Sequence, residues 1–378
     1  MKRSILTLGM LALGFLTKAQ TNDLTYVANG AEMTITPEVI YSVINGKMTI
    51  VGTGKITNSG NVMIMDDLVH NAGFRTLTTA GLPKTNGGNF ILKMYDTNLS
   101  NLRYGQLYFG EGTPQMNVTG IVDKEYKDNH HGSYQQIALP FWQKKMSELS
   151  AELLSPGHTF KFGAGNRANR YSGEAIMWYY SRYARFEDVA ATDVAYEQAY
   201  YILGTKNFNA SAAVKTIKGT PLSSIYGSGW GAGGILSSDV VFGTGGKNQN
   251  FYRERYNTYI QDQWEVATPW TGNFGKNIVM LGNPYLTNLD IINYLPRWTN
   301  NGILGLRLEP TGVTTSSGNG TQSAGAKHVA YTSGSPYLTP TGDVSAVIKP
   351  MQTFVMKFRN SNAQNINLYE GRRFAFTA

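Results

Sequence analysis

Short runs of alternating apolar and polar residues dominate the chain from Leu24 to Leu68. Alternation with a period of two is typical of β-strands with one buried face. Asn-Gly or Ser-Gly turn sequences separate most runs, at a spacing of about eight to ten residues. The pattern predicts a short N-terminal β-roll or solenoid over residues 20–70, with a meander at the edge of a sandwich as the alternative. The expected strands are Thr25–Val27, Glu32–Ile35, Val39–Val43, Lys47–Val51, Lys55–Thr57 and Val62–Met65.

Residues 71–378 continue with short apolar runs divided by Gly, Asn, Ser and Thr. So many short strands favour an all-β fold, with one large antiparallel β-sandwich region of jelly-roll-like type. If this region holds two sandwiches, we place the boundary near residues 205–250. The expected strands are Phe90–Tyr95, Gln106–Phe109, Asn117–Val122, Tyr134–Leu139, Thr159–Phe162, Ala175–Tyr180, Tyr200–Leu203, Val214–Ile217, Val240–Phe242, Thr258–Val266, Asn277–Gly282, Leu304–Leu308, His328–Thr332, Ser345–Ile348, Thr353–Phe358, Asn365–Tyr369 and Arg373–Phe376.

Helical patterns are rare in this chain. Gln143–Leu154 predicts a helix, because its apolar residues share one face: Met146, Leu149, Leu153 and Leu154. A second short helix is expected after the Gly-Asn-Pro-Tyr sequence at 282–285, where Thr287 and Asp290 match a capping box.

The first nineteen residues form a secretory signal pattern. Lys2 and Arg3 are followed by an apolar run from Ile5 to Leu16, and a small residue, Ala19, stands where a signal peptidase cleaves. This run is too short to span a bilayer as a stable helix. Residues 1–19 are therefore predicted to be a signal peptide, and the mature chain is expected at the cell surface or outside the cell, with the periplasm as the alternative.

The net charge and the composition limit which binding partners and which chemical sites the chain can have. Removal of the signal peptide lowers the formal net charge from +8 to about +5, and the remaining Lys and Arg residues are scattered along the chain. Nucleic-acid binding usually needs a concentrated basic face, so none is expected. The chain has no cysteine, which excludes thiolate metal sites and thiol nucleophiles. No later apolar run is long enough for a transmembrane span.

Three motifs resemble cofactor or metal sites, but the residues around each motif do not fit such a site. Gly229–Gly234 matches G-x-G-x-x-G, yet a strand-like run follows where a dinucleotide site needs a helix. Gly243–Lys247 has Asn248 where a P-loop needs Ser or Thr. His130 and His131 lack the spacing of metal ligands, and the segment DKEYKDNHHG around them is typical of a solvated hairpin loop. We therefore expect no cofactor and no metal.

An aromatic cluster provides the candidate binding site. In a strand, Trp178 and Tyr180 would lie on one face and Tyr179 on the other. If both faces are buried, the segment is a core strand. If one face is exposed, Trp178, Tyr180, Arg182 and Tyr183 would form a platform on which sugar rings stack, with the arginine bonding to hydroxyl or carboxylate groups.

Five phrases of the chain resemble exported cell-surface proteins of the Bacteroidetes that use type IX secretion. They are NIVMLGNPYLTNLDI (277–291), VIKPMQTFVMKF (347–358), TIKGTPLSS, QIALPF and the N-terminal phrase Gly54–Val62. In these phrases, Leu286 replaces a proline and Thr353 replaces a glycine of the usual pattern. The resemblance implies large adhesin-like proteins and no catalytic residues. It also implies a C-terminal sorting domain, and no such segment is recognisable before Ala378.

The function expected from these observations is binding. We expect an exported adhesin-like or structural protein without catalysis, whose partners are surface polysaccharide or other cell-surface proteins and, during export, the secretion machinery. A secreted polysaccharide-active enzyme or its carbohydrate-binding component is the alternative. Two carboxyl groups about 5–10 Å apart in an open groove would favour the enzyme.

Overall fold

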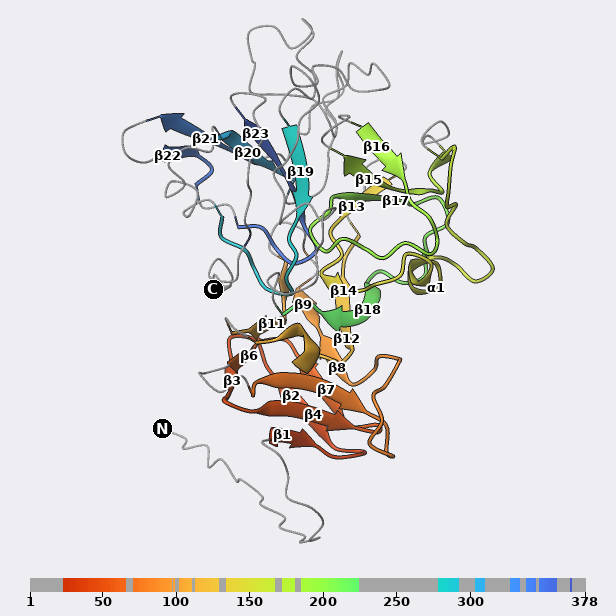
Figure 1. Cartoon of the computed structure of the whole chain (residues 1–378), viewed down its shortest axis with the longest axis vertical. Helices are drawn as coiled ribbons and strands as arrows, with labels where there is room; N and C mark the ends of the chain where they lie inside the picture. The colour runs from red at the N-terminus through yellow and green to blue at the C-terminus, as the bar shows by residue number, and fades with distance from the viewer. Residues whose placement is uncertain are drawn as a thin grey trace, which may run out of the picture.

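The protein has two β-rich parts, one above the other in Figure 1. The computed structural model describes residues 23–65, 71–96, 98, 102–110, 113–128, 134–166, 172–180, 185–223, 278–291, 303–309, 327–333, 338–344, 347–358 and 368. The lower part contains parallel strands, and the upper part contains antiparallel strands. The predicted all-β class is confirmed, since almost all regular elements of the described residues are strands.

Parallel pairing organises the N-terminal part. From β1 to β8, successive strands go to three sheets in turn, so that β1 to β5 each pair with the strand three positions later, whereas a meander would pair consecutive strands. Beyond β8, β6 pairs with β11 and β8 pairs with β12. The first sheet has the order β1-β4-β7 and the second β11-β6-β3, while β2, β5, β8 and β12 run parallel in the third. The bounds are β1 Asp23–Val27, β2 Glu32–Ile35, β3 Ile40–Ile44, β4 Lys47–Val51, β5 Lys55–Asn58, β6 Asn61–Met65, β7 Gly73–Leu77, β8 Phe90–Leu92, β11 Gln106–Phe109 and β12 Val122–Tyr126.

The predicted strands of residues 20–70 match these elements within two residues at each end. Their inward side chains, such as Ile50, Ile56 and Ile64, belong to one buried apolar cluster. Burying such side chains on three sheets stabilises the part because each removes apolar area from water. Parallel pairing continues beyond residue 70, through β7 and β8 as far as β12.

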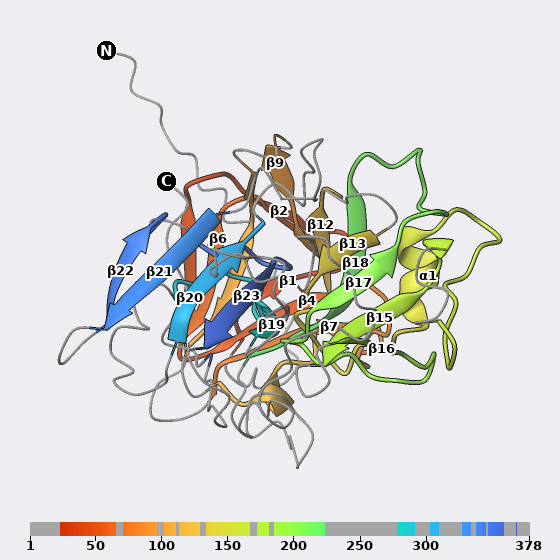
Figure 2. The ribbon, with the colours of Figure 1, turned by 90° about the horizontal axis from the view of Figure 1, so that it is seen from above.

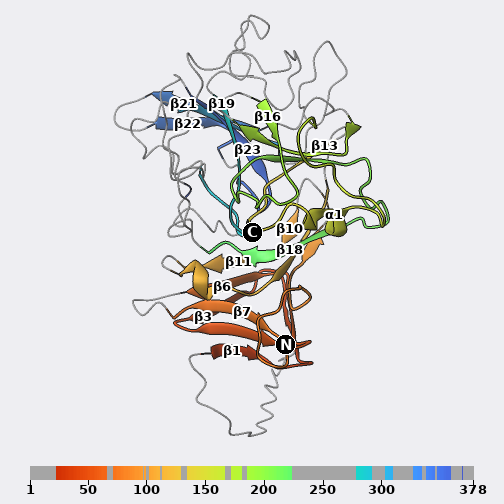
Figure 3. The same cartoon turned by 45° about the vertical axis from the view of Figure 1, so that its right-hand side comes forward.

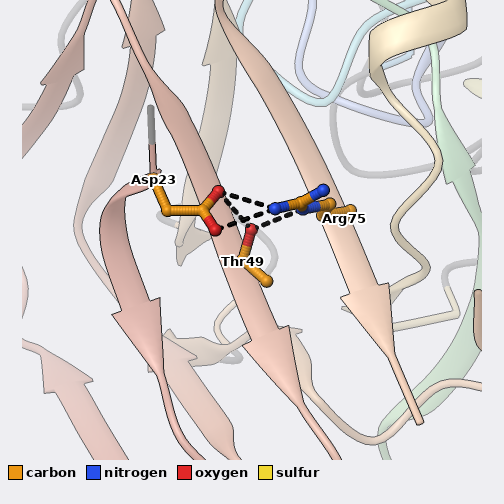
Figure 4. Close-up of polar contacts among 3 residues, drawn as sticks. All are labelled: Asp23, Thr49 and Arg75. Atoms are coloured by element: carbon orange, nitrogen blue, oxygen red, sulfur yellow. Dashed lines mark hydrogen bonds and ion pairs between the residues drawn. The ribbon is translucent and has the colours of Figure 1, made fainter. Parts of the chain in front are cut away.

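Asp23, Thr49 and Arg75 form a polar cluster that links the three strands of the first sheet (Figure 4). Arg75 of β7 donates from Nη2 to both carboxylate oxygens of Asp23 of β1, at 2.9 and 2.8 Å. Its Nε donates to Thr49 Oγ1 of β4 at 2.7 Å, and that hydroxyl donates to Asp23 at 2.8 Å. Three strands are thus joined by one chain of charge-assisted hydrogen bonds, which are the stronger kind.

Replacing Arg75 by methionine is expected to lower the free energy of unfolding by about 2 kcal/mol, because the carboxylate of Asp23 is buried and would lose its charged partner. Urea unfolding followed by circular dichroism measures the change. The control is Lys55→Met, whose ion pair with Glu32 is exposed and should contribute less than about 0.5 kcal/mol. Equal effects of the two substitutions would contradict the prediction.

Two antiparallel sheets form the upper part, green and blue in Figure 2. The first has the order β13-β17-β15-β16, and the second has the order β19-β23-β20-β21-β22. Met177 and Tyr179 of the first sheet share a buried cluster with Met280 and Val355 of the second. The bounds are β13 Tyr134–Ile137, β15 Ile176–Tyr180, β16 Arg185–Asp188, β17 Tyr201–Gly204, β19 Ile278–Gly282, β20 Ile303–Leu308, β21 Lys327–Ser333, β22 Leu338–Gly342 and β23 Thr353–Phe358.

Strand β12 connects the two parts. It runs parallel to β8 of the N-terminal part and antiparallel to β18 (Lys215–Pro221), which in turn pairs with β14 (Phe141–Trp142). A short hairpin of β9 (Met94–Asp96) and β10 (Arg103–Tyr104) also lies at this level (Figure 3). The six-stranded sheet therefore changes from parallel to antiparallel at β12.

One of the two predicted helices is present. Helix α1 (Glu148–Leu153) buries Leu149 and Leu153, and it starts later than predicted because Lys145 bridges to Val194 in strand fashion. The helix expected from Thr287 is wrong, because residues 285–291 contain no helix. Leu289 instead exchanges two backbone hydrogen bonds with Ile348, so a tertiary pairing overrides the local capping pattern.

Two strand predictions are also wrong. Residues 115–117 form a 3-10 helix, and the backbone amides of Thr119 and Gly120 both bond to the Phe74 carbonyl, so β12 begins only at Val122. Thr159–Phe162 forms only an isolated bridge at Lys161. The predictions for 240–242, 258–266 and 373–376 lie outside the described residues, as do the signal peptide and the two glycine motifs near 229 and 243. Of the predicted strand 365–369 only residue 368 is described, and of 345–348 only residues 347 and 348, where Ile348 forms an isolated bridge. No helix of the described residues is long and apolar enough to cross a membrane.

Candidate functional site

The aromatic cluster lies on β15 and forms a small stacked group. Met177 and Tyr179 are buried between the sheets, while Trp178 and Tyr180 on the opposite face are half-buried. The rings of Trp178 and Tyr180 stack with centroids 5.2 Å apart, and the ring of Tyr196 lies 5.7 Å from Trp178. We call Trp178, Tyr180 and Tyr196 the aromatic patch.

The aromatic patch is partly a core element and partly an exposed platform, which were the two interpretations of its sequence. Trp178 packs against the main apolar cluster with part of its surface, whereas Tyr196 keeps 38% of its surface exposed. Stacking at this distance is the offset arrangement that aromatic pairs prefer. Arg182 and Tyr183, the other predicted members of the site, lie outside the described residues.

Four of the five phrases named in the sequence analysis meet in one place. Asn283 of the Gly-Asn-Pro-Tyr turn donates its backbone amide to the carbonyl of Gln352, at 2.9 Å. Ala138 of the QIALPF phrase donates to the carbonyl of Met351. A Cβ added to Gly219 of the TIKGTPLSS phrase would lie 2.7 Å from the ring of Phe141, which belongs to QIALPF. These short sequences are therefore complementary parts of one junction between the antiparallel sheets and β18.

A pocket opens beside this junction, and its residues come from both parts of the molecule. Its volume is about 670 Å³, including the open mouth. The N-terminal part contributes the β9–β10 hairpin and the end of β12, while the upper part contributes β13, Glu309 and the turn before β23. We call it the junction pocket. It is lined by Met94, Leu102, Tyr104, Lys124, Glu125, Tyr126, Lys127, Gln135, Gln136, Ile137, Glu309, Lys349, Pro350, Met351, Gln352 and Thr353.

Lys124 is the most unusual residue of the junction pocket. Only 2% of it is exposed, and its Nζ has no hydrogen-bond partner among the described residues. Its ammonium lies 4.1 Å from the ring centroid of Tyr104, within the range of a cation–π contact. Burial lowers the pKa of Lys124 to about 7, against which the nearby carboxylate of Glu125 acts.

The two carboxylates of the junction pocket are engaged. Glu125 accepts from Lys93 Nζ at 2.7 Å and from the backbone amide of Met94 at 3.0 Å. Glu309 lies 3.4 Å from Nε of the buried Arg307. A glycosidase pair needs one carboxyl that is protonated and one that is free to attack or to activate water. Two carboxylates held by cations fit that chemistry less well than a binding role.

The sequence prediction missed the junction pocket and misplaced one of its walls. The segment from Asp123 to Tyr126 is strand β12, with Asp123 and Lys124 buried, and not the start of a solvated hairpin loop. Charged residues in succession resemble a loop when their partners are unknown. The alternation of Val122, Lys124 and Tyr126 was the one available signal for a strand. His130 and His131 lie outside the described residues, and no group of metal ligands occurs in the described part of the chain.

Comparisons with protein-family models, with curated proteins and with solved structures gave no match. The function is therefore argued from the aromatic patch and the junction pocket themselves.

Proposed function

We propose that the mature chain is an exported protein of the cell surface or extracellular space that acts by binding, as adhesins do, and without catalysis. Its partners are surface polysaccharide or other cell-surface proteins, and the secretion machinery during export. The signal pattern of residues 1–19 supports export. The observation that carries the binding role is the aromatic patch, with its stacked and partly exposed rings.

The aromatic patch suits a sugar ring for two physical reasons. The faces of Trp178 and Tyr180 offer apolar area to the C–H groups of a pyranose, while the Tyr hydroxyls bond to its polar groups. Rigid aromatic side chains also lose little conformational entropy on binding. Because Trp178 is anchored in the main apolar cluster, its ring is held in place before the ligand arrives.

A glycan array probed with residues 20–378 tests this proposal. We expect binding to at least one polysaccharide, and Trp178→Ala should weaken it by about tenfold or more, because a central aromatic anchor is lost. Trp178→Phe should retain much of the affinity. Tyr26→Ala is the matched control, since Tyr26 is 49% exposed on β1 in the other part of the molecule.

Two results would contradict this proposal. One is the absence of binding to any glycan by the folded wild type, and the other is equal binding by wild type and Trp178→Ala. The enzyme alternative is supported only by the presence of Glu125 and Glu309 in the junction pocket. Release of reducing ends from a polysaccharide, abolished by Glu125→Gln, would favour that alternative.

A further inference from the structure

The junction pocket has polar groups that the protein itself does not satisfy. Besides Lys124 Nζ, Tyr126 OH and Gln136 Nε2 are buried and have no hydrogen-bond partner among the described residues. Lys124 and Tyr126 stand two positions apart on β12 and so share a face. Each buried polar group without a partner costs free energy, so several of them beside one pocket point to a ligand.

All three of these groups can donate a hydrogen bond. The lysine amine, the tyrosine hydroxyl and the glutamine amide nitrogen together form a donor set that matches an acceptor with several lone pairs. A carboxylate has two oxygens and about four acceptor sites, and it bonds strongly to a protonated amine. A ligand that offers mainly donors would leave these groups unsatisfied.

The charges around the junction pocket also favour a carboxylate as the ligand. Glu125 and Glu309 are already engaged by Lys93 and Arg307, two cations that are not among the pocket-lining residues. Lys124, Lys127 and Lys349 line the pocket as well, and the positive charge of Lys349 is disfavoured by burial and by Lys327, so its pKa is lowered. An incoming anion would relieve the cost of charging these lysines.

We propose that the junction pocket binds a small ligand that carries a carboxylate, with Lys124 as its counter-charge and Tyr126 and Gln136 as further donors. The site shares no residue with the aromatic patch and is independent of the function proposed above. A uronic acid unit of a polysaccharide and a free organic acid share this chemistry, and the two sources are separated by the choice of probe.

Isothermal titration calorimetry of residues 20–378 with D-glucuronate, D-glucose and lactate tests the site. We expect glucuronate, lactate or both to bind, and we expect glucose not to bind. Binding by glucuronate alone assigns an acidic sugar, and comparable binding by lactate assigns the carboxylate itself. Lys124→Met should weaken carboxylate binding by at least about thirtyfold, and Lys218→Met on the neighbouring β18 should leave it unchanged, because Lys218 is exposed and does not line the pocket.

The pH dependence of the wild type provides a second readout that needs no variant. A bound carboxylate favours the protonated amine of Lys124. The affinity of the protein for the carboxylate ligand should therefore fall about tenfold per pH unit above 7. Three results would each overturn the proposal. The first is that neither glucuronate nor lactate binds, and the second is that glucose binds as tightly as glucuronate. The third is that Lys124→Met binds these ligands with unchanged affinity.

Discussion

Replacing Glu197 by glutamine is expected to raise the free energy of unfolding at pH 7 by about 3 kcal/mol. Glu197 is only 2% exposed, and its Oε2 has no hydrogen-bond partner among the described residues. Burial raises the pKa of this carboxyl to about 8, although backbone amides, including that of Gln143, donate to it. The folded protein therefore holds Glu197 protonated at neutral pH.

The sign of the pH dependence follows from proton counting. Between about pH 4.5 and 8 the unfolded chain has lost the proton of Glu197, whereas the folded chain keeps it. Stability therefore falls as the pH rises through this window, by at most about 5 kcal/mol in total. A glutamine has no proton to lose, so the variant should not show this part of the decline.

Urea unfolding measures the effect at pH 5 and 6, where Lys124 is mostly protonated in both states, and at pH 7. Burial also raises the pKa values of Asp123 and Glu152, so the informative quantity is the difference between wild type and Glu197→Gln. Glu32→Gln serves as the control, because its side chain is 72% exposed. A difference that stays constant from pH 5 to pH 7 would contradict the assignment.

Replacing Asn283 by alanine is expected to cost about 3–5 kcal/mol of stability. Asn283 is fully buried, and its Nδ2 donates to the carbonyls of Thr287 and Ile348 at 2.8 and 3.0 Å. Its Oδ1 accepts from the backbone amide of Tyr285 at 3.0 Å. Alanine would remove the partners of the Tyr285 amide and the Thr287 carbonyl, and each buried group left without a partner is costly. The Ile348 carbonyl would lose one of its two bonds and keep the one from the Leu289 amide.

Thermal and urea unfolding of Asn283→Ala provide the measurement, with Asn209→Ala as the matched control. Asn209 Oδ1 accepts two exposed hydrogen bonds from Ser211, so its loss should cost less than about 1 kcal/mol. Asn283→Asp keeps the shape of the side chain but loses both donated bonds, and it should be about as unstable as alanine. A cost below about 1 kcal/mol for Asn283→Ala would show that the turn does not depend on this side chain.

The strands were predictable from local pattern, and the pocket was not. Alternation with period two located the strands from Lys47 to Val51 and from Thr353 to Phe358 at their observed bounds, since each residue's face depends only on its neighbours. The same rule placed Trp178 and Tyr180 on one face of β15. The junction pocket combines residues from Met94 to Thr353, and no local pattern reports which distant segments meet.

The wrong helix prediction at Thr287 and the wrong loop prediction at Asp123 have one cause, which is pairing with residues distant in the sequence. The capping pattern at Thr287 is a local preference worth about 1 kcal/mol, and the pairing of Leu289 with Ile348 outweighs it. Asp123, Lys124 and Glu125 looked like a solvated loop, because three charged residues in succession are seldom buried. Their burial in β12 depends on β8 and β18 on either side.

The sequence by itself therefore determined the all-β class, most strand positions, and the face on which each aromatic residue of β15 lies. These properties depend on chemistry within a few residues along the chain. Only the tertiary structure decided that the N-terminal strands pair in parallel, that the phrases around Asn283 and Met351 meet, and that Lys124 is buried beside a pocket. Such properties depend on which distant surfaces exclude water together, and that is a consequence of the whole fold.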